Sequence, residues 1–305
     1  MNIKLMLEMM YVLCGIVLIV SGIYSIIDKE NPKRIGSGMF WFIFGFLFIG
    51  GPYISPVVVG ALLLVMGVLS ATKQVSMANF TNSSEKFRVE QAKKIGNKLF
   101  VPAIMIGVVA FSVAQFTNLG GLIGLGLGAI TALIIAMVVT GEKVDKIPYD
   151  SSRILQQMGV TIVLPQLLGS LGSVFSKAGV GTVIADLMGS VVPEGNQLVG
   201  VVVYCLAMAI FTMIMGNAFA AFAVITAGIG YPFVIAQGGD PAVVGAMGLT
   251  AGYCGTLLTP MGANFNIVPA SILEMKNKNG VILKQVGVAL PLLFIHIFLM
   301  YMLAF

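Results

Sequence analysis

The stretch Gly252-Tyr-Cys-Gly-Thr-Leu-Leu-Thr-Pro-Met-Gly-Ala-Asn-Phe-Asn266 interrupts an otherwise apolar segment, residues 241–273, with polar and helix-breaking residues. Pro260 lacks a backbone donor and Gly262 weakens a helix, so the carbonyls and amides around them lose their intrahelical partners. A discontinuous transporter helix offers such freed groups to ions and charged ligands inside the membrane. We therefore predict a broken helix over residues 241–273, with a binding function at the break.

The alternative is a proline-kinked helix whose Asn264 and Asn266 only pack against a neighbouring helix. Thr259, these two asparagines, a proline and a glycine all lie between positions 259 and 266. Polar groups are costly in hydrocarbon, so this density inside an apolar segment favours binding over packing.

A second polar interruption, Met215-Gly-Asn-Ala-Phe-Ala-Ala-Phe222, separates two apolar arms, residues 198–215 and 218–236. Gly216 lets the backbone turn, and Asn217 supplies both hydrogen-bond donors and an acceptor. A two-residue turn between apolar residues is a poor aqueous loop. We predict a re-entrant hairpin, 198–236, whose apex lies inside protein at membrane depth. The alternatives are two full spans and a kinked span with one packing asparagine.

The composition places these two segments in a membrane protein. The 305 residues are 58% hydrophobic and only 10% charged, and a soluble fold of this size cannot bury that much apolar surface. Composition therefore excludes a soluble enzyme, a nucleic-acid-binding protein and a disordered chain. It predicts an all-α polytopic membrane protein.

Other apolar stretches predict the remaining membrane spans, at residues 5–27, 38–51, 53–71, 99–116, 119–139, 154–175 and 281–305. Between the last two, residues 177–196 keep apolar side chains at helical spacing and predict an interfacial arm helix, with Val180, Val183, Ile184, Leu187 and Val191 on its apolar face. We expect scaffold-like spans over residues 1–152 and a transport-type repeat over residues 153–305.

Most of the 17 Lys and Arg residues fall in four loops, at residues 29–34, 73–98, 143–153 and 276–284. The positive-inside rule predicts that all four loops are cytoplasmic, where they anchor at the lipid headgroups. The chain then starts outside, and the hairpin 198–236 begins and ends outside. The net charge of +5 thus reflects membrane orientation and not a nucleic-acid partner.

Other motifs have simpler interpretations. The glycines of the string 118–128, Gly120, Gly124 and Gly128, predict close helix packing and not nucleotide binding. His296, the only histidine, is expected to pack by hydrogen bonding. The sequence places no carboxylate pair, Ser-Lys pair or metal cluster at membrane depth, so we expect no enzymatic activity.

The two interruptions together resemble the second half of the ion-transporter superfamily of elevator-type carriers, which includes the divalent anion and sodium symporters. In that superfamily a re-entrant hairpin ends in a Ser-Asn-Thr-like tip, and a broken helix carries a Thr-Pro and Asn loop. Gly216-Asn217-Ala218 is similar to the tip, with Gly and Ala replacing the hydroxyl residues, and Thr259-Pro260 with Asn264 is similar to the loop. The stretch 165–180 resembles the span that leads into the arm helix.

More closely, the chain resembles one subunit of the bacterial two-component 5-oxoproline (pyroglutamate) transporter family. The resemblance rests on the stretch 255–266, the basic loop 73–98 and the six spans expected before residue 176. It implies a monoanionic substrate, a hetero-oligomeric carrier with cation coupling, and the bacterial inner membrane. An elevator domain needs two hairpin-plus-broken-helix repeats, so we expect a second membrane subunit to supply the other.

The expected substrate- or ion-binding residues are those of the two interruptions: Gly216, Asn217, Ala218, Thr259, Pro260, Gly262, Asn264 and Asn266. Sodium is the expected coupling ion, at Asn217, Thr259 and Asn264, because this region holds neutral oxygens but no Asp, Glu or His that could carry a proton. No other cofactor is expected. Two alternatives are a self-sufficient homodimeric organic-anion carrier and an accessory membrane subunit without its own substrate site.

Overall fold

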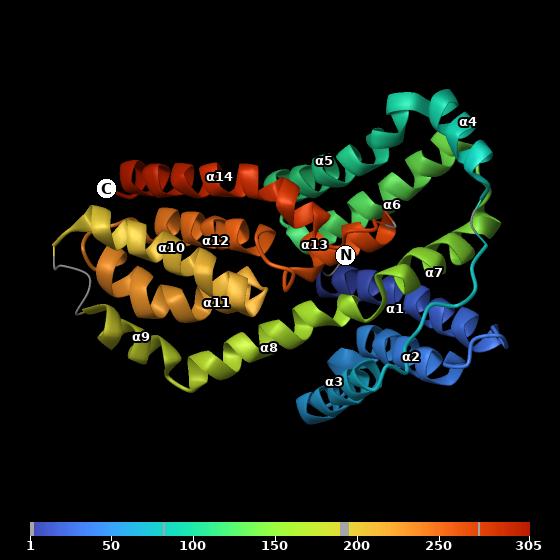
Figure 1. Cartoon of the computed structure of the whole chain (residues 1–305), viewed down its shortest axis with the longest axis horizontal. Helices are drawn as coiled ribbons and strands as arrows, with labels where there is room; N and C mark the ends of the chain where they lie inside the picture. Colours follow the sequence, from blue (N-terminus) through green and yellow to red (C-terminus); the bar gives the residue numbers. More distant parts are fainter. Residues whose placement is uncertain (1–2, 82, 190–194, 274) are drawn as a thin grey trace. The chain divides into compact units, whose positions relative to one another are not determined.

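A computed structural model describes residues 3–81, 83–189, 195–273 and 275–305 (Figure 1). The side chains of nine further residues lie outside the description: Leu164, Pro165, Gln166, Leu168, Gly169, Leu171, Ser176, Ala263 and Asn264. The described part contains helices and loops but no strand, and seven of its helices are long and apolar enough to cross a membrane. The expected class is confirmed: the chain is an all-helical, multi-pass membrane protein.

Backbone contacts divide the chain into two compact units, Met1–Gly159 and Val160–Phe305. In the first unit, α1 (Ile3–Ile27) and α2 (Arg34–Gly50) pack along their lengths. A Cβ on Gly15 would lie 2.8 Å from the carbonyl oxygen of Gly45, and a Cβ on Gly45 would lie 2.8 Å from that of Gly15. The two backbones therefore touch, as small residues permit between membrane helices. The short η1 (Gly51–Tyr53) and α3 (Pro56–Ala71) follow.

Glycines also join α5 (Val101–Phe116) to α6 (Gly121–Thr140). A Cβ on Gly124 or Gly128 would lie 2.8 Å from a carbonyl oxygen of α5, so the predicted packing role is confirmed at both positions. Gly120 differs, because it has a φ of +82° and no neighbour within 4 Å of a built Cβ. The exposed α4 (Glu85–Ile95) and η2 (Gly96–Phe100) precede α5.

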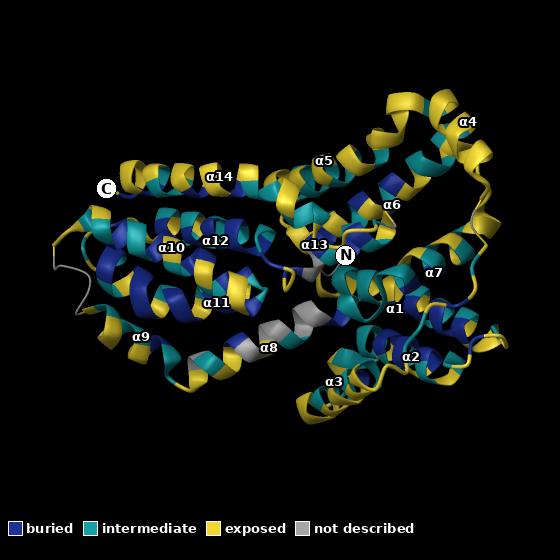
Figure 2. Cartoon of the chain, viewed as in Figure 1, coloured by how far each residue is buried: buried dark blue, intermediate teal, exposed yellow. Residues whose placement is uncertain are grey.

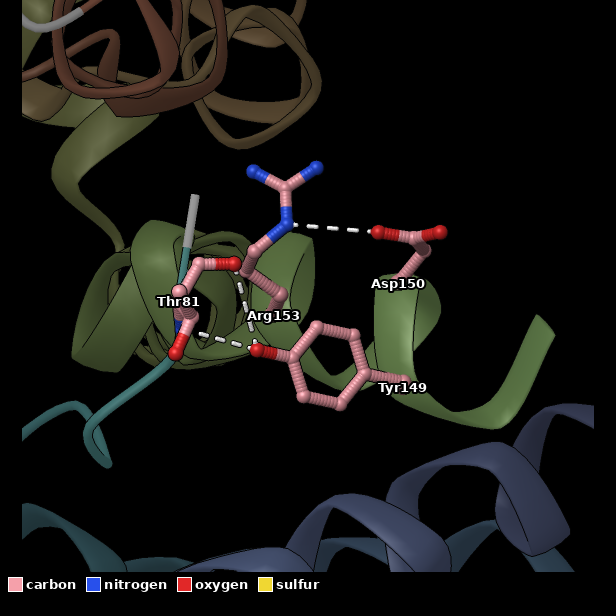
Figure 3. Close-up of polar contacts among 4 residues, drawn as sticks. All are labelled: Thr81, Tyr149, Asp150 and Arg153. Carbon is pink, nitrogen blue, oxygen red and sulfur yellow. Dashed lines mark hydrogen bonds and ion pairs between the residues drawn. The ribbon is translucent and has the colours of Figure 1, made fainter. Parts of the chain in front are cut away.

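Part of the basic loop is fixed as an extended strap along α2 and α7 (Ile147–Met158), a helix that η3 (Val144–Lys146) precedes. Side chains accept hydrogen bonds from its backbone amides: Ser76 donates to the Ser37 hydroxyl at 2.8 Å and Ala78 to the Gln156 side chain at 2.8 Å. The Thr81 amide donates to the Tyr149 hydroxyl at 2.7 Å (Figure 3). The same figure shows Arg153 paired with Asp150 on α7, at 3.4 Å.

The predicted span 154–175 is wrong as a single helix. α7 ends at Met158, and Gly159 follows with a φ of +60°, a left-handed conformation that glycine adopts without strain. The chain continues through η4 (Gly159–Val163) into α8 (Leu164–Lys177). The expected arm helix is α9 (Val180–Gly189), which starts after the predicted residue 177. Residues 190–194, with Val191 and Glu194 of that prediction, lie outside the described residues.

The second unit holds the segments with the two polar interruptions. α10 (Gln197–Met215) is followed by α11 (Ala218–Ile225), which continues as a π-helical stretch, η5 (Thr226–Ile235), containing Pro232. The broken segment forms α12 (Pro241–Leu257) and α13 (Ala263–Ile272), and α14 (Gly280–Ala304) closes the chain. Buried residues concentrate on α10, α11 and α12 (Figure 2).

Small residues and one buried tyrosine bring α10 and α12 together. Gly255 packs directly on the backbone of Ala209, and Gly248 packs on the ring of Tyr204. Tyr204 is fully buried, and its hydroxyl shares a 2.8 Å hydrogen bond with the Thr226 hydroxyl, at the start of the π-helical stretch. This core holds the ends of α10 and α12 beside each other.

Candidate functional site

The apex between α10 and α11 packs on the break between α12 and α13. Gly216 ends α10 in the left-handed conformation, with a φ of +71°, and its amide donates to the Thr212 carbonyl at 2.7 Å. A Cβ on Gly216 would lie only 2.5 Å from the carbonyl oxygen of Met261, which belongs to the break. Two interruptions that are distant in sequence therefore meet at backbone contact.

This contact gathers four helix ends. α10 and α12 end there, and the last carbonyls of a helix lack intrahelical partners and carry partial negative charge. α11 and α13 begin there, and the first amides of a helix carry partial positive charge. One small region thus offers backbone donors to an anion and backbone acceptors to a cation.

Asn217 caps the start of α11. Its side-chain oxygen accepts hydrogen bonds from the amides of Phe219, at 2.9 Å, and Ala220, at 3.3 Å. An amide oxygen has two lone pairs, so both are engaged at this cap. Ala218 is buried against α12, where a Cβ on Gly252 would lie 3.1 Å from its side chain. Asn217 therefore fixes the shape of the apex.

The break itself is a tight loop around Thr259. Thr259 is buried, and its hydroxyl accepts a hydrogen bond from the Met261 amide at 3.2 Å, while Pro260 is exposed. Gly262 leaves no room for a side chain, because a Cβ there would lie 2.5 Å from the Thr256 carbonyl oxygen. Gly262 is also the N-cap of α13, and a glycine has no side chain that could accept from the first amides of the helix.

Asn266 joins the two sides of the break. It is fully buried, and its side-chain nitrogen donates to the carbonyls of Thr256, at 3.0 Å, and Thr259, at 2.6 Å. Both donors are therefore used within the protein. The side chain of Asn264 lies outside the described residues, so its predicted contact with ligand stays a prediction.

Two buried oxygens in this region have no hydrogen-bond partner among the described residues: the side-chain oxygen of Asn266 and the hydroxyl of Thr212. Unpartnered polar atoms in an apolar interior are costly, and bound water or an ion commonly satisfies them. Thr212 is not among the residues predicted from the sequence. Its signal is a hydroxyl residue one helical turn before Gly216 in an apolar arm.

An aromatic row borders the apex and the break. The ring centroids of Phe219 and Tyr253 lie 6.0 Å apart, and those of Tyr253 and Phe265 lie 6.4 Å apart. Phe219 and Phe265 are 63% and 45% exposed, so the row presents an apolar surface beside the polar helix ends. Neither phenylalanine was predicted for the site, although each lies within two residues of a predicted asparagine.

His296 and a metal centre are the two other kinds of site considered from the sequence. His296 contacts the Leu292 carbonyl of its own helix at 2.7 Å, as a packing residue would. Within the described residues, no group of three His, Cys, Asp or Glu side chains could hold a metal ion.

A protein-family model matches residues 8–305, and its description is DUF979, protein of unknown function. The chain belongs to the DUF979 family. The DUF979 match includes the apex, the break and nearly all of both units. Neither the curated proteins nor the solved structures contain a match to the chain.

Proposed function

We propose that this DUF979 chain is a membrane subunit of a secondary transporter for a small carboxylate, and the sequence resemblance names 5-oxoproline as that substrate. One observation carries the proposal: the apex at Gly216 packs on the broken helix at Met261. Paired half-helix ends in the membrane are the means by which secondary transporters bind charged substrates and coupling ions.

The start of α13, which has a glycine at its N-cap, is the proposed position of the carboxylate. Its backbone amides and partial positive charge favour an anion, and the two interruptions contain no Asp or Glu that would repel one. The aromatic row of Phe219, Tyr253 and Phe265 then faces the apolar body of the substrate. A small molecule with one carboxylate and an apolar ring fits both requirements.

Sodium is the proposed coupling ion. The carbonyl ends of α10 and α12 and the unpartnered oxygens of Thr212 and Asn266 are neutral acceptors of the kind that coordinate it. The Asn217 oxygen already accepts two amide hydrogen bonds, and the Thr259 hydroxyl accepts one, so we assign these two residues to shaping the site. Sodium also offsets the charge of the carboxylate, which lowers the cost of desolvating it.

A partner membrane subunit is proposed to complete the carrier. An elevator domain contains two hairpin-plus-broken-helix repeats, and the described part of this chain contributes one apex packed on one break. A self-sufficient homodimer is the second candidate. Co-purification of a different membrane chain with the tagged protein separates the two.

Substitution of the α11 cap tests the site. Asp caps helices about as well as Asn, so Asn217→Asp should keep the apex folded while placing a negative charge where the substrate binds. We expect binding of radiolabelled 5-oxoproline to the purified carrier to weaken at least about tenfold, or ~1.4 kcal/mol.

Asn196→Asp is the matched control. Asn196 caps the start of α10 in the same way, accepting from the Val199 amide at 3.1 Å, but it lies at the other end of that helix. The Asn196→Asp protein should bind 5-oxoproline with the affinity of the wild type. Equal affinity in both variants, at unchanged stability, would place the substrate elsewhere and contradict the proposed site.

A further inference from the structure

A groove runs along one face of α1 in the first unit, and none of its lining residues belongs to the apex or the break. Its volume is about 370 Å³, which is within the range of small-ligand pockets. The α1 wall consists of side chains repeating every three or four residues, and the other wall comes from the end of α2 and from η1. The apolar lining includes Leu5, Met9, Val12, Ile16, Phe48 and Ile49.

One end of this groove is polar. Glu8 lines it, with a side chain that is only 24% exposed. The Tyr53 hydroxyl lies 3.5 Å from one carboxylate oxygen of Glu8, and the Lys4 ammonium lies 3.9 Å from the other. The groove therefore combines a long apolar surface with a carboxylate, a phenol and an ammonium at its mouth.

This mouth lies at the level of lipid headgroups. Glu8 is in the second turn of α1, a 25-residue helix of about 37 Å, slightly longer than the hydrocarbon core is thick. Tyr53 ends η1 at the same end of the α1–α2 pair, and tyrosine is enriched at membrane interfaces. The basic turn 29–34 lies at the opposite end, so the charge pattern assigns the groove to the outer leaflet.

We propose that this groove binds phosphatidylethanolamine, with one acyl chain along α1 and the ethanolamine ammonium on the carboxylate of Glu8. Lipid tails are already in apolar surroundings, so the apolar walls alone cannot select among lipids. Selection must come from the mouth. There the carboxylate attracts a headgroup ammonium, and the exposed Lys4 ammonium, 3.9 Å from that carboxylate, is proposed to pair with the phosphate of the same lipid.

Lipid retention tests the proposal. The purified full-length protein is equilibrated with equal amounts of phosphatidylethanolamine, phosphatidylcholine and phosphatidylglycerol, washed with mild detergent, and its retained lipids are quantified by mass spectrometry. We expect phosphatidylethanolamine to be enriched over both other lipids. Glu8→Gln should lower this enrichment about two- to fivefold, the effect of a partly exposed ion pair.

Two further variants control the assignment. Glu142→Gln removes an exposed acid outside the groove and should leave the enrichment unchanged. Val12→Phe narrows the apolar part and should lower retention of phosphatidylethanolamine even where Glu8→Gln fails to fold. Equal retention of the three lipids by the wild type, or enrichment that survives both Glu8→Gln and Val12→Phe, would overturn the proposal. So would crosslinking of another protein chain to Val12→Cys in place of lipid.

Discussion

Gly216 is the residue on which the contact between apex and break depends. It needs a left-handed backbone, and it also leaves no space for a Cβ against Met261. We predict that Gly216→Ala destabilises the protein by roughly 1–3 kcal/mol more than Gly141→Ala. Gly141 has a similar φ, +72° against +71°, but nothing within 4 Å of a built Cβ.

The difference between these two variants isolates the packing contact, because the backbone strain is common to both. Thermal or denaturant unfolding of the purified proteins measures it. Equal losses of stability in Gly216→Ala and Gly141→Ala would show that the apex is not closely packed against the break.

Asn266 and Asn264 lie two positions apart, and their substitution by alanine is predicted to have different effects: a loss of stability at Asn266 and a loss of substrate affinity at Asn264. Asn266→Ala removes two buried hydrogen bonds, so it should lower stability by roughly 1–3 kcal/mol, although the Thr259 carbonyl still accepts from the Gly262 amide at 3.2 Å. Asn279→Ala, at a helix start where the side chain makes no capping bond, is its control.

Asn264→Ala should weaken substrate binding by roughly 1–3 kcal/mol, about 5- to 150-fold, with little effect on folding. Unfolding and equilibrium binding measured on the same preparations separate the two roles. A well-folded Asn264→Ala protein with unchanged affinity would assign Asn264 to packing.

At the scale of elements, the sequence predicted long apolar helices well and their interruptions unevenly. The spans predicted at 5–27 and 281–305 match α1 and α14 to within about two residues, because hydrocarbon thickness sets the length of an apolar run. The break after α12 was predicted from Pro260 and Gly262, which disrupt helix hydrogen bonding by their own covalent structure.

Other features could not be predicted from apolar periodicity. The positive-φ turn at Gly159, the π-helical stretch at Thr226–Ile235 and the cap formed by Asn217 are local backbone geometries that this periodicity does not encode. The contact of Gly216 with Met261 likewise needs the fold, since the two residues are far apart in sequence.

At the scale of elements we also predict that the apex at Gly216 and Asn217 lies within the membrane and does not reach the cytoplasm. The arms, Gln197–Met215 and Ala218–Ile235, are 19 and 18 residues long, so their length alone also permits two complete spans. The prediction of a re-entrant hairpin rests instead on the packing of Gly216 against Met261 and on the absence of charged residues at the apex. We predict that a cysteine at position 217, in a background without Cys14, Cys205 and Cys254, stays unreactive to an impermeant thiol reagent from the cytoplasm.

Glu90→Cys in the basic loop is the positive control, because Glu90 is exposed on α4 and the loop is predicted to be cytoplasmic. If position 217 reacted as fast as position 90 in the absence of substrate, the apex would be a cytoplasmic loop. The hairpin would then be two complete spans.

At the scale of the whole molecule, the second unit supplies neutral oxygens and helix ends at the apex and the break, and the sequence there contains no Asp, Glu or His. Asp240 begins α12 as its cap, accepting from the Ala242 amide at 2.8 Å, at the far end of that helix from the break. A proton carrier needs a titrating group that alternates between the two sides. We therefore propose coupling to sodium.

Uptake into proteoliposomes tests this claim most directly, with the chain reconstituted together with the proposed partner subunit and given radiolabelled 5-oxoproline. An inward sodium gradient should drive accumulation, and Asn217→Asp should abolish most of it. A proton gradient with sodium rigorously absent should drive none. Accumulation that follows the proton gradient and ignores an imposed sodium gradient would contradict the account, as would the absence of uptake under either gradient.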